Sequence, residues 1–236
     1  MREPLVLLPG MMCDARVFAP QITALSGSTT LVLGPVTQGE RIEEIASGLL
    51  DQLPPRFALA GQGMGGVVAL ELLRRAPDRI SRIALLATQV LPELPAIAAD
   101  REPQIVAAQS GRLAEVIQNR LASGFLAPGP QRNAVQAQAM EMAESLGPEV
   151  FVQQSRALQR RRDQQPTLGK CKIPALVLCG EHDAICPVKR HNFMAELIPY
   201  ATLTVLAEAG HLPSLEQPEA TTAALRDWMQ QPLVLQ

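Results

Sequence analysis

The chain has 236 residues, of which 47% are hydrophobic, and a formal net charge of −2 at pH 7. This length fits one large α/β domain with an insertion better than two independent domains, and the charge leaves no positive field for collecting nucleic-acid phosphates. No apolar run is long enough to span a membrane, and Met1 to Pro4 is too short for a signal peptide before the first apolar run, so we expect a cytoplasmic protein.

Short apolar runs alternate with helical patterns over most of the chain. Runs of strand length occur at 5–8, 30–33, 57–60, 83–87, 175–179 and 202–206, and helical patterns lie near 17–25, 41–53, 64–76, 188–198 and 218–229. This alternation predicts an α/β fold in which helices cover both faces of a parallel sheet.

The segment between the fourth and fifth apolar runs is helical throughout. Its predicted helices lie near 94–110, 112–123, 131–146 and 149–163, separated by glycine and proline. We therefore predict a core made of residues 1–90 and 169–236 and a helical cap of residues 91–168. Such a cap should lie as a lid over the carboxyl ends of the strands, where ligands enter open α/β sheets.

Residues 61–66 read Gly-Gln-Gly-Met-Gly-Gly, between a predicted strand and a predicted helix. In the G-x-S-x-G nucleophile elbow, small residues permit a sharp turn that projects the central side chain from the sheet. The central position here is Gly63, which tolerates strained backbone but has no oxygen with which to attack a carbonyl. A phosphate-binding loop would need Lys-Ser or Lys-Thr after its last glycine. The motif therefore predicts an elbow without its nucleophile.

Two later loops carry the residues that would serve such a nucleophile. Asp183 follows a predicted strand, where its carboxylate could orient an imidazole and stabilise the protonated form. His211 follows the next strand and is the predicted general base. Of the two other histidines, we interpret His182 as part of a loop and His191 as a surface or packing residue in a helix. The chain order of nucleophile, acid and histidine is that of serine hydrolases built on an α/β sheet.

The first predicted strand ends in Leu-Pro-Gly-Met-Met at residues 8–12. A loop at this place would aim a backbone N–H across the site, toward the N–H of the residue after the elbow centre. We predict that the N–H groups of Met11 and Met64 form an oxyanion hole, which the glycine at position 63 leaves unchanged.

Several further motifs accompany the elbow: Leu-Leu-Pro-Gly at 7–10, Asp14 and Phe18, Ala-Pro-Asp-Arg at 76–79, Gly-Glu-His-Asp at 180–183, and Gly-His-Leu-Pro-Ser-Leu-Glu-Gln-Pro at 210–218. With these motifs the chain resembles the α/β-hydrolase superfamily over almost its whole length, in the small lidded esterase group of BioH-type and MenH-type proteins. The resemblance implies an α/β-hydrolase fold and a carboxylic ester hydrolase that works by Ser-His-Asp acyl transfer.

The glycine at position 63 leaves three interpretations open. Our preferred one is a working esterase in which serine has been replaced, so that the chain is inactive or nearly so. The second is a natural non-catalytic relative that binds a small apolar ligand under its lid. The third is another reaction on the same scaffold, with His211 acting on a water in the space that serine would fill, or as the base of a lyase. A thioesterase is a further alternative.

The four cysteines, at positions 13, 171, 179 and 186, lack a paired zinc-ligand spacing and are interpreted as buried thiols. Cys13 and Cys186 could border the pocket, but neither sits on the elbow and neither has a specific cation to lower its pKa. A metal site built from His182, Asp183 and Cys186 is weakly supported, because Asp183 already has a role. We predict no metal and no cofactor.

Sequence says less about the substrate. Only 3% of the residues are aromatic, so we expect a pocket lined by Leu, Met, Val and Ile, with Met12 beside Met11 and Met64, suited to a small or medium apolar ester. Arg156 and Arg160 lie one helical turn apart. We interpret them either as part of a solvated helix face or as a site for a substrate carboxylate or a coenzyme A phosphate. We expect a small-molecule ester as partner, and a monomer or homodimer.

Overall fold

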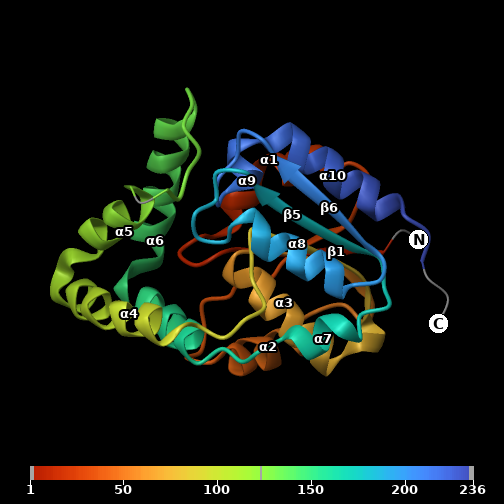
Figure 1. The fold of residues 1–236 in the computed structure, drawn as a ribbon, viewed down its shortest axis with the longest axis horizontal. Helices are drawn as coiled ribbons and strands as arrows, with labels where there is room; N and C mark the ends of the chain where they lie inside the picture. The colour runs from red at the N-terminus through yellow and green to blue at the C-terminus, as the bar shows by residue number, and fades with distance from the viewer. Residues whose placement is uncertain (1–2, 123, 234–236) are drawn as a thin grey trace.

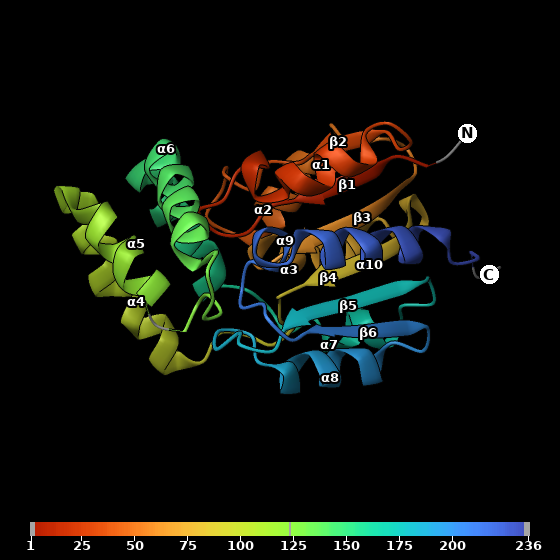
Figure 2. The same cartoon turned by 90° about the horizontal axis from the view of Figure 1, so that it is seen from above.

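The structure, a computed structural model, describes residues 3–122 and 124–233. In this part of the chain, six strands form one parallel sheet in the order β2-β1-β3-β4-β5-β6 (Figure 2; Figure 1 shows the fold from another side). The strands are β1 Leu5–Leu8, β2 Leu31–Leu33, β3 Phe57–Gln62, β4 Ile80–Leu86, β5 Ala175–Gly180 and β6 Ala201–Leu206. The predicted α/β fold with a parallel sheet is confirmed.

Apolar side chains leave the sheet on both faces because successive residues of a strand point in opposite directions. In β1, Leu5 and Leu7 belong to one core cluster, with α1 and α10, whereas Val6 and Leu8 belong to the other, with α2, α3 and α8. The helices on the two faces are α1 Ala19–Leu25, α2 Ile42–Leu50, α3 Met64–Arg75, α8 Val188–Leu197 and α10 Pro218–Gln230.

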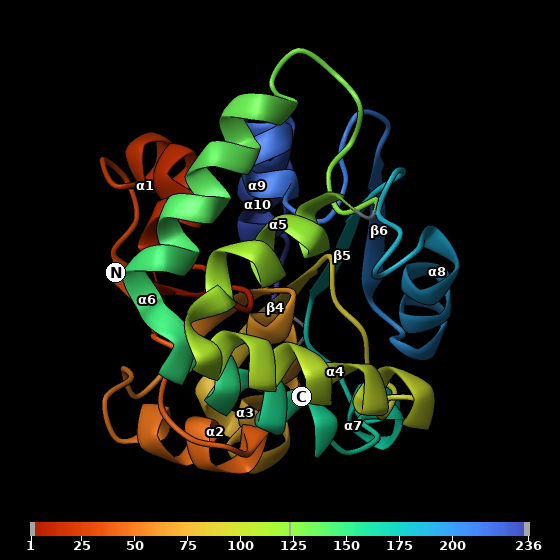
Figure 3. The same cartoon turned by 90° about the vertical axis from the view of Figure 1, so that its left-hand side faces the viewer.

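Four helical elements that follow β4 lie beyond the carboxyl ends of the strands (Figures 2 and 3). They are α4 Pro95–Ala107, the π-helical turn η3 Ala108–Arg112, α5 Leu113–Ala122 and α6 Arg132–Gln159. The helices expected at 131–146 and 149–163 are joined in α6, which bends at Gly147, where φ is 80° and ψ is 174°, and which ends at Gln159, four residues before the second expected helix does. These helices therefore cover the edge of the sheet at which the elbow lies.

Four short elements were not predicted. They are the 3₁₀ turns η1 Ala15–Phe18 and η2 Pro77–Arg79 and the helices α7 Gln165–Gly169 and α9 Pro213–Glu216. Across the residues that the structure describes, no helix has the length and hydropathy needed to cross a bilayer.

Candidate active site

The turn between β3 and α3 has the backbone shape that a nucleophile elbow requires. At Gly63, φ is 55° and ψ is −118°, a combination that residues with a Cβ rarely adopt. The Gly63 N–H donates to the Leu86 carbonyl at 2.9 Å, and the Thr88 hydroxyl donates to the Gly63 carbonyl at 2.6 Å. A Cβ on Gly65 would lie 2.1 Å from the Leu8 carbonyl oxygen, so only glycine fits there. Neighbouring strands therefore hold the turn in place.

Asp183 and His211 come together at the same end of the sheet. His211 Nδ1 lies 2.8 Å from Asp183 Oδ2, and the Asp183 side chain is buried. The other carboxylate oxygen accepts the N–H groups of Ile185 and Cys186, each at 2.8 Å. With Nδ1 engaged, Nε2 is left to face the elbow, and a Cβ built on Gly63 would lie 3.4 Å from it. An imidazole in this position can accept a proton from a group beside Gly63.

Two residues that the sequence did not single out fix the position of His211. Its ring packs edge to face on Phe125, with 4.7 Å between centroids, and its N–H donates to the Phe125 carbonyl at 2.7 Å. The buried carboxylate of Glu216 accepts the N–H groups on either side of the histidine, from Gly210 at 2.9 Å and Leu212 at 2.8 Å. The segment after α5 thus contributes directly to the placement of the imidazole.

Met11 and Met64 both line the pocket. Within the described residues, neither backbone N–H donates to a protein acceptor, which leaves both available to a ligand oxygen. Met12 lies elsewhere. Its side chain is buried in the core, its backbone has φ 57°, and its N–H donates to Gln154 Oε1 at 2.9 Å, so Met12 is not among the lining residues.

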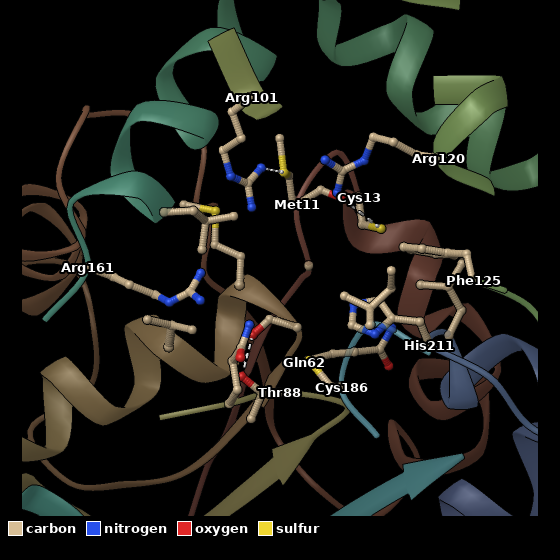
Figure 4. Close-up of a pocket in the computed structure, with 18 residues that line it drawn as sticks. Met11, Cys13, Gln62, Thr88, Arg101, Arg120, Phe125, Arg161, Cys186 and His211 are labelled. Carbon is tan, nitrogen blue, oxygen red and sulfur yellow. Dashed lines mark hydrogen bonds between the residues drawn. The ribbon is translucent and has the colours of Figure 1, made fainter. Parts of the chain in front are cut away.

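Three arginines from the part of the chain between β4 and β5 point into the pocket (Figure 4). Arg101 belongs to α4, Arg120 to α5, and Arg161 follows α6. The cavity has a volume of about 70 Å³, and no Asp or Glu of the described chain is among the residues that line it. Its apolar lining includes Met11, Met64, Val67, Leu158, Ile185 and Leu212. The apolar part agrees with the sequence prediction, but the positive charge was not expected.

The buried carboxylate of Glu93 pairs with two of these arginines. Glu93 bonds Arg101 at 2.6 and 2.9 Å and Arg161 at 2.8 Å. Burial by itself raises the pKa of Glu93, but the hydrogen bonds and charges of these two arginines outweigh burial and lower it. Burial and the nearby charge of Arg101 lower the pKa of Arg120 to about 10, which still leaves the Arg120 guanidinium charged at neutral pH. Among the described residues that line the pocket, arginines are present and acidic side chains are absent, so the lining favours an anion over a cation.

Arg156 and Arg160 do not reach this pocket. Arg156 bonds Glu102, and Arg160 bonds Glu40 at 3.1 Å. Both pairs lie at the surface. Arg161 points inward instead because α6 ends at Gln159 and the chain then turns toward Leu91, whose carbonyl accepts from Arg161. A substrate-binding role for Arg156 and Arg160 stays a prediction that this geometry does not support.

The pocket also contains two thiols. Burial, together with the neighbouring Asp14, raises the pKa of Cys13 to about 12, and burial also raises the pKa of Cys186. Cys186, Asp183 and His211 offer ligand atoms within 4.8 Å of one another. The Asp183 oxygens and His211 Nδ1 already bond each other or the backbone, so His211 Nε2 is the nitrogen that remains for another ligand. The absence of a metal and of a cofactor stays a prediction.

A buried histidine supports the elbow from behind. The Thr88 N–H donates to His191 Nε2 at 3.1 Å, so this nitrogen is the acceptor and Nδ1 carries the proton, 3.3 Å from the Pro187 carbonyl. Burial lowers the pKa of His191 to about 4, which keeps the ring neutral. His191 is thus a packing residue, one of the two roles that the sequence allowed.

These features define the class of protein. Residues 5–225 match the model of the alpha/beta hydrolase family, and the chain belongs to that family. Membership agrees with the parallel sheet, the elbow after β3 and the Asp183–His211 pair.

Particular relatives are esterases by name. The chain is 26% identical over 203 residues to a pimeloyl-[acyl-carrier protein] methyl ester esterase of Neisseria meningitidis, covering 83% of this chain and 78% of the relative. It is 25% identical over 233 residues to the protein of the same name from Aromatoleum aromaticum, covering 94% and 90%. Among solved structures, a malate-bound esterase from Thermogutta terrifontis superposes with a TM-score of 0.88 at 26% identity, covering 97% and 89%. MenH from S. aureus matches in fold, with a TM-score of 0.85 at 20% identity, covering 98% and 94%.

Proposed function

We propose that this protein is a carboxylic ester hydrolase of the serine-hydrolase type in which glycine occupies the nucleophile position. The observation that carries the proposal is the Asp183–His211 pair. His211 Nε2 lies 3.4 Å from the position that a Cβ on Gly63 would take. In the serine form, the residue 63 hydroxyl would attack, His211 would move its proton and Asp183 would orient His211. The N–H groups of Met11 and Met64 would stabilise the oxyanion.

The esterase names of the relatives support acyl transfer over lyase chemistry and over binding without turnover. In the proposed assignment, residues 91–168 act as the cap, because their helices and the segment after α5 enclose the elbow and contact His211. The chain as it stands lacks the attacking oxygen, so we expect turnover far below that of its serine form.

The pocket arginines refine the proposed substrate from an apolar ester to a small ester that carries an anionic group. Guanidinium groups bind carboxylates through charge-assisted hydrogen bonds, which are stronger than neutral ones. Arg101, Arg120 and Arg161 line the pocket, and no Asp or Glu of the described residues does. The malate bound to the Thermogutta esterase, a dicarboxylate, is consistent with an anion near such a site. A cavity of about 70 Å³ favours an acyl group of a few heavy atoms, since one water needs about 10–15 Å³.

The test compares two esters of similar size, methyl hydrogen succinate and methyl butyrate, on the Gly63→Ser protein. We expect hydrolysis of both and a higher kcat/KM for the anionic ester. In that background, Arg120→Gln should lower kcat/KM for methyl hydrogen succinate by about 10- to 100-fold, the worth of one hydrogen bond to a charged group, and leave methyl butyrate unchanged.

Arg156→Gln is the matched control, because it removes the same charge from a surface pair outside the pocket. Equal losses on both esters from Arg120→Gln would contradict the anionic substrate. Failure of the Gly63→Ser protein to hydrolyse either ester would contradict the proposed function itself.

A further inference from the structure

The space next to Gly63 is open toward His211. A Cβ at this position would lie 3.4 Å from His211 Nε2 and 3.6 Å from the Gly10 Cα, both ordinary van der Waals distances. Gly10, Gly63 and His211 all line the pocket, so the space is continuous with it. An unbonded molecule must lie farther from the Gly63 Cα than a covalently attached hydroxyl. A water can do so and still donate a hydrogen bond to His211 Nε2.

Gln62 supplies a second reason to expect a small polar ligand in this pocket. Its side chain is fully buried, and neither amide atom has a hydrogen-bond partner in the described part of the chain. Buried amides are nearly always hydrogen-bonded, so an unpaired one at a pocket indicates a ligand or an ordered water. Gln62 lines the same pocket as His211 (Figure 4). Its amide could offer both a donor and an acceptor to a small polar ligand or to a water.

Resting on the proposed function, we infer that the protein with Gly63 is itself a slow esterase that hydrolyses small esters in one displacement, by attack of a water that His211 deprotonates. One proton of the water moves to Nε2 as its oxygen bonds the ester carbonyl carbon. The carbonyl oxygen becomes an oxyanion that accepts the N–H groups of Met11 and Met64. When the C=O bond re-forms, the bond to the alcohol breaks and the alkoxide takes the proton from His211. The products are the acid and the alcohol, and no acyl-enzyme forms.

A covalent route, in which a pocket thiol attacks the ester, is disfavoured because these thiols are hardly ionised at neutral pH. The pKa of Cys13, raised to about 12 by burial and Asp14, leaves almost no thiolate at neutral pH, and burial raises the pKa of Cys186 in the same direction. Asp183 still holds His211 at 2.8 Å, so the general base is oriented for a water as it would be for a serine. The residues that would serve a serine therefore remain able to serve a water.

The experiment measures hydrolysis of 4-nitrophenyl acetate by the protein as it stands, by its His211→Ala variant and by Gly63→Ser. We expect the Gly63 protein to turn over repeatedly at about 10³ to 10⁴ times the spontaneous rate, with no burst of nitrophenolate and no acetylated protein in intact mass spectra. Loss of the general base in His211→Ala should lower this rate by about 10²-fold or more. His182→Ala is the matched control, because His182 is exposed and outside the pocket, and should change nothing.

A second variant tests the water site. Gln62→Leu removes the unpaired amide, so we expect the Gly63 protein to unfold at a higher temperature while hydrolysing esters about 10-fold more slowly. If Gln62 had a purely structural role, the unfolding temperature and the rate of hydrolysis would not change in opposite directions. The inference is overturned if the Gly63 protein shows no turnover, turnover insensitive to His211→Ala, or an acetylated intermediate, while Gly63→Ser is active. If Gly63→Ser is also inert, and nothing depends on His211, the proposed function fails with it.

Discussion

Placing a side chain at position 63 should strain the backbone without causing a clash. The nearest atoms to a new Cβ are His211 Nε2 at 3.4 Å and the Gly10 Cα at 3.6 Å, so no neighbour has to move. The cost comes from φ 55° and ψ −118°, a conformation that costs a residue with a Cβ about 1 to 3 kcal/mol. In a domain of this size, each kcal/mol shifts the melting temperature by about 2 to 4 °C, so Gly63→Ser should lower it by about 2 to 12 °C.

Gly63→Ala separates strain from chemistry, because it adds the same Cβ without a hydroxyl. Thermal unfolding followed by circular dichroism should give nearly equal destabilisation for the Ala and Ser proteins, while only the Ser protein gains the nucleophile. The sign of the change in melting temperature for Gly63→Ala is decisive, since replacing glycine by alanine at an unstrained position stabilises a protein by about 0.4 to 1 kcal/mol. A rise in melting temperature for Gly63→Ala would refute the strained turn.

Three further outcomes follow from buried charges and thiols. Because the pKa of Cys13 is about 12 against an ordinary 9.0, iodoacetamide should alkylate it in the native protein about 10³ times more slowly than a free thiol. His191 has its pKa lowered from 6.5 to about 4, so its stabilisation is present above pH 6.5 and is lost as the pH falls toward 4; His191→Gln should flatten this part of the unfolding curve, and His182→Ala should not. Glu93→Gln leaves Arg101 and Arg161 without their carboxylate and should destabilise the protein by about 3 to 5 kcal/mol in denaturant titrations.

Sequence alone was enough for the core of the fold where the signal was local. β1 is an apolar run with clear ends and was predicted residue for residue. β4 begins at Ile80, three residues before the predicted run, because Ser81 and Arg82 interrupt the apolar pattern. Both are nevertheless buried, since Ser81 bonds Glu3 and Arg82 bonds Glu3 and the Trp228 carbonyl. Such long-range partners cannot be seen in a local pattern.

The candidate site likewise has residues whose meeting the sequence could predict and residues whose meeting it could not. Gly63, Asp183 and His211 each follow a strand, so a parallel sheet brings them to one edge and sequence order could predict their meeting. Arg101 and Arg120 come from separate inserted helices and carry no motif, so only their packing reveals a shared pocket.

The arginine cluster near the end of α6 is a further example of what the sequence could not predict. Successive residues of a helix point about 100° apart, and α6 ends at Gln159, so neighbours in this cluster face different ways. Arg156 and Arg160 face surface carboxylates while Arg161 faces the pocket. The sequence indicated the cluster but could not select its functional member.

The most direct test of the account is fluorophosphonate labelling of the Gly63→Ser protein beside the protein with Gly63, with hydrolysis of short-chain esters measured on both. A fluorophosphonate reacts only with a serine that an oriented histidine activates and an oxyanion hole serves. We expect Gly63→Ser to be labelled at residue 63 and to hydrolyse esters at an ordinary enzymatic rate, and we expect the Gly63 protein to remain unlabelled. If the folded Gly63→Ser protein is neither labelled nor active, Asp183, His211 and the two N–H groups do not form a working acyl-transfer site.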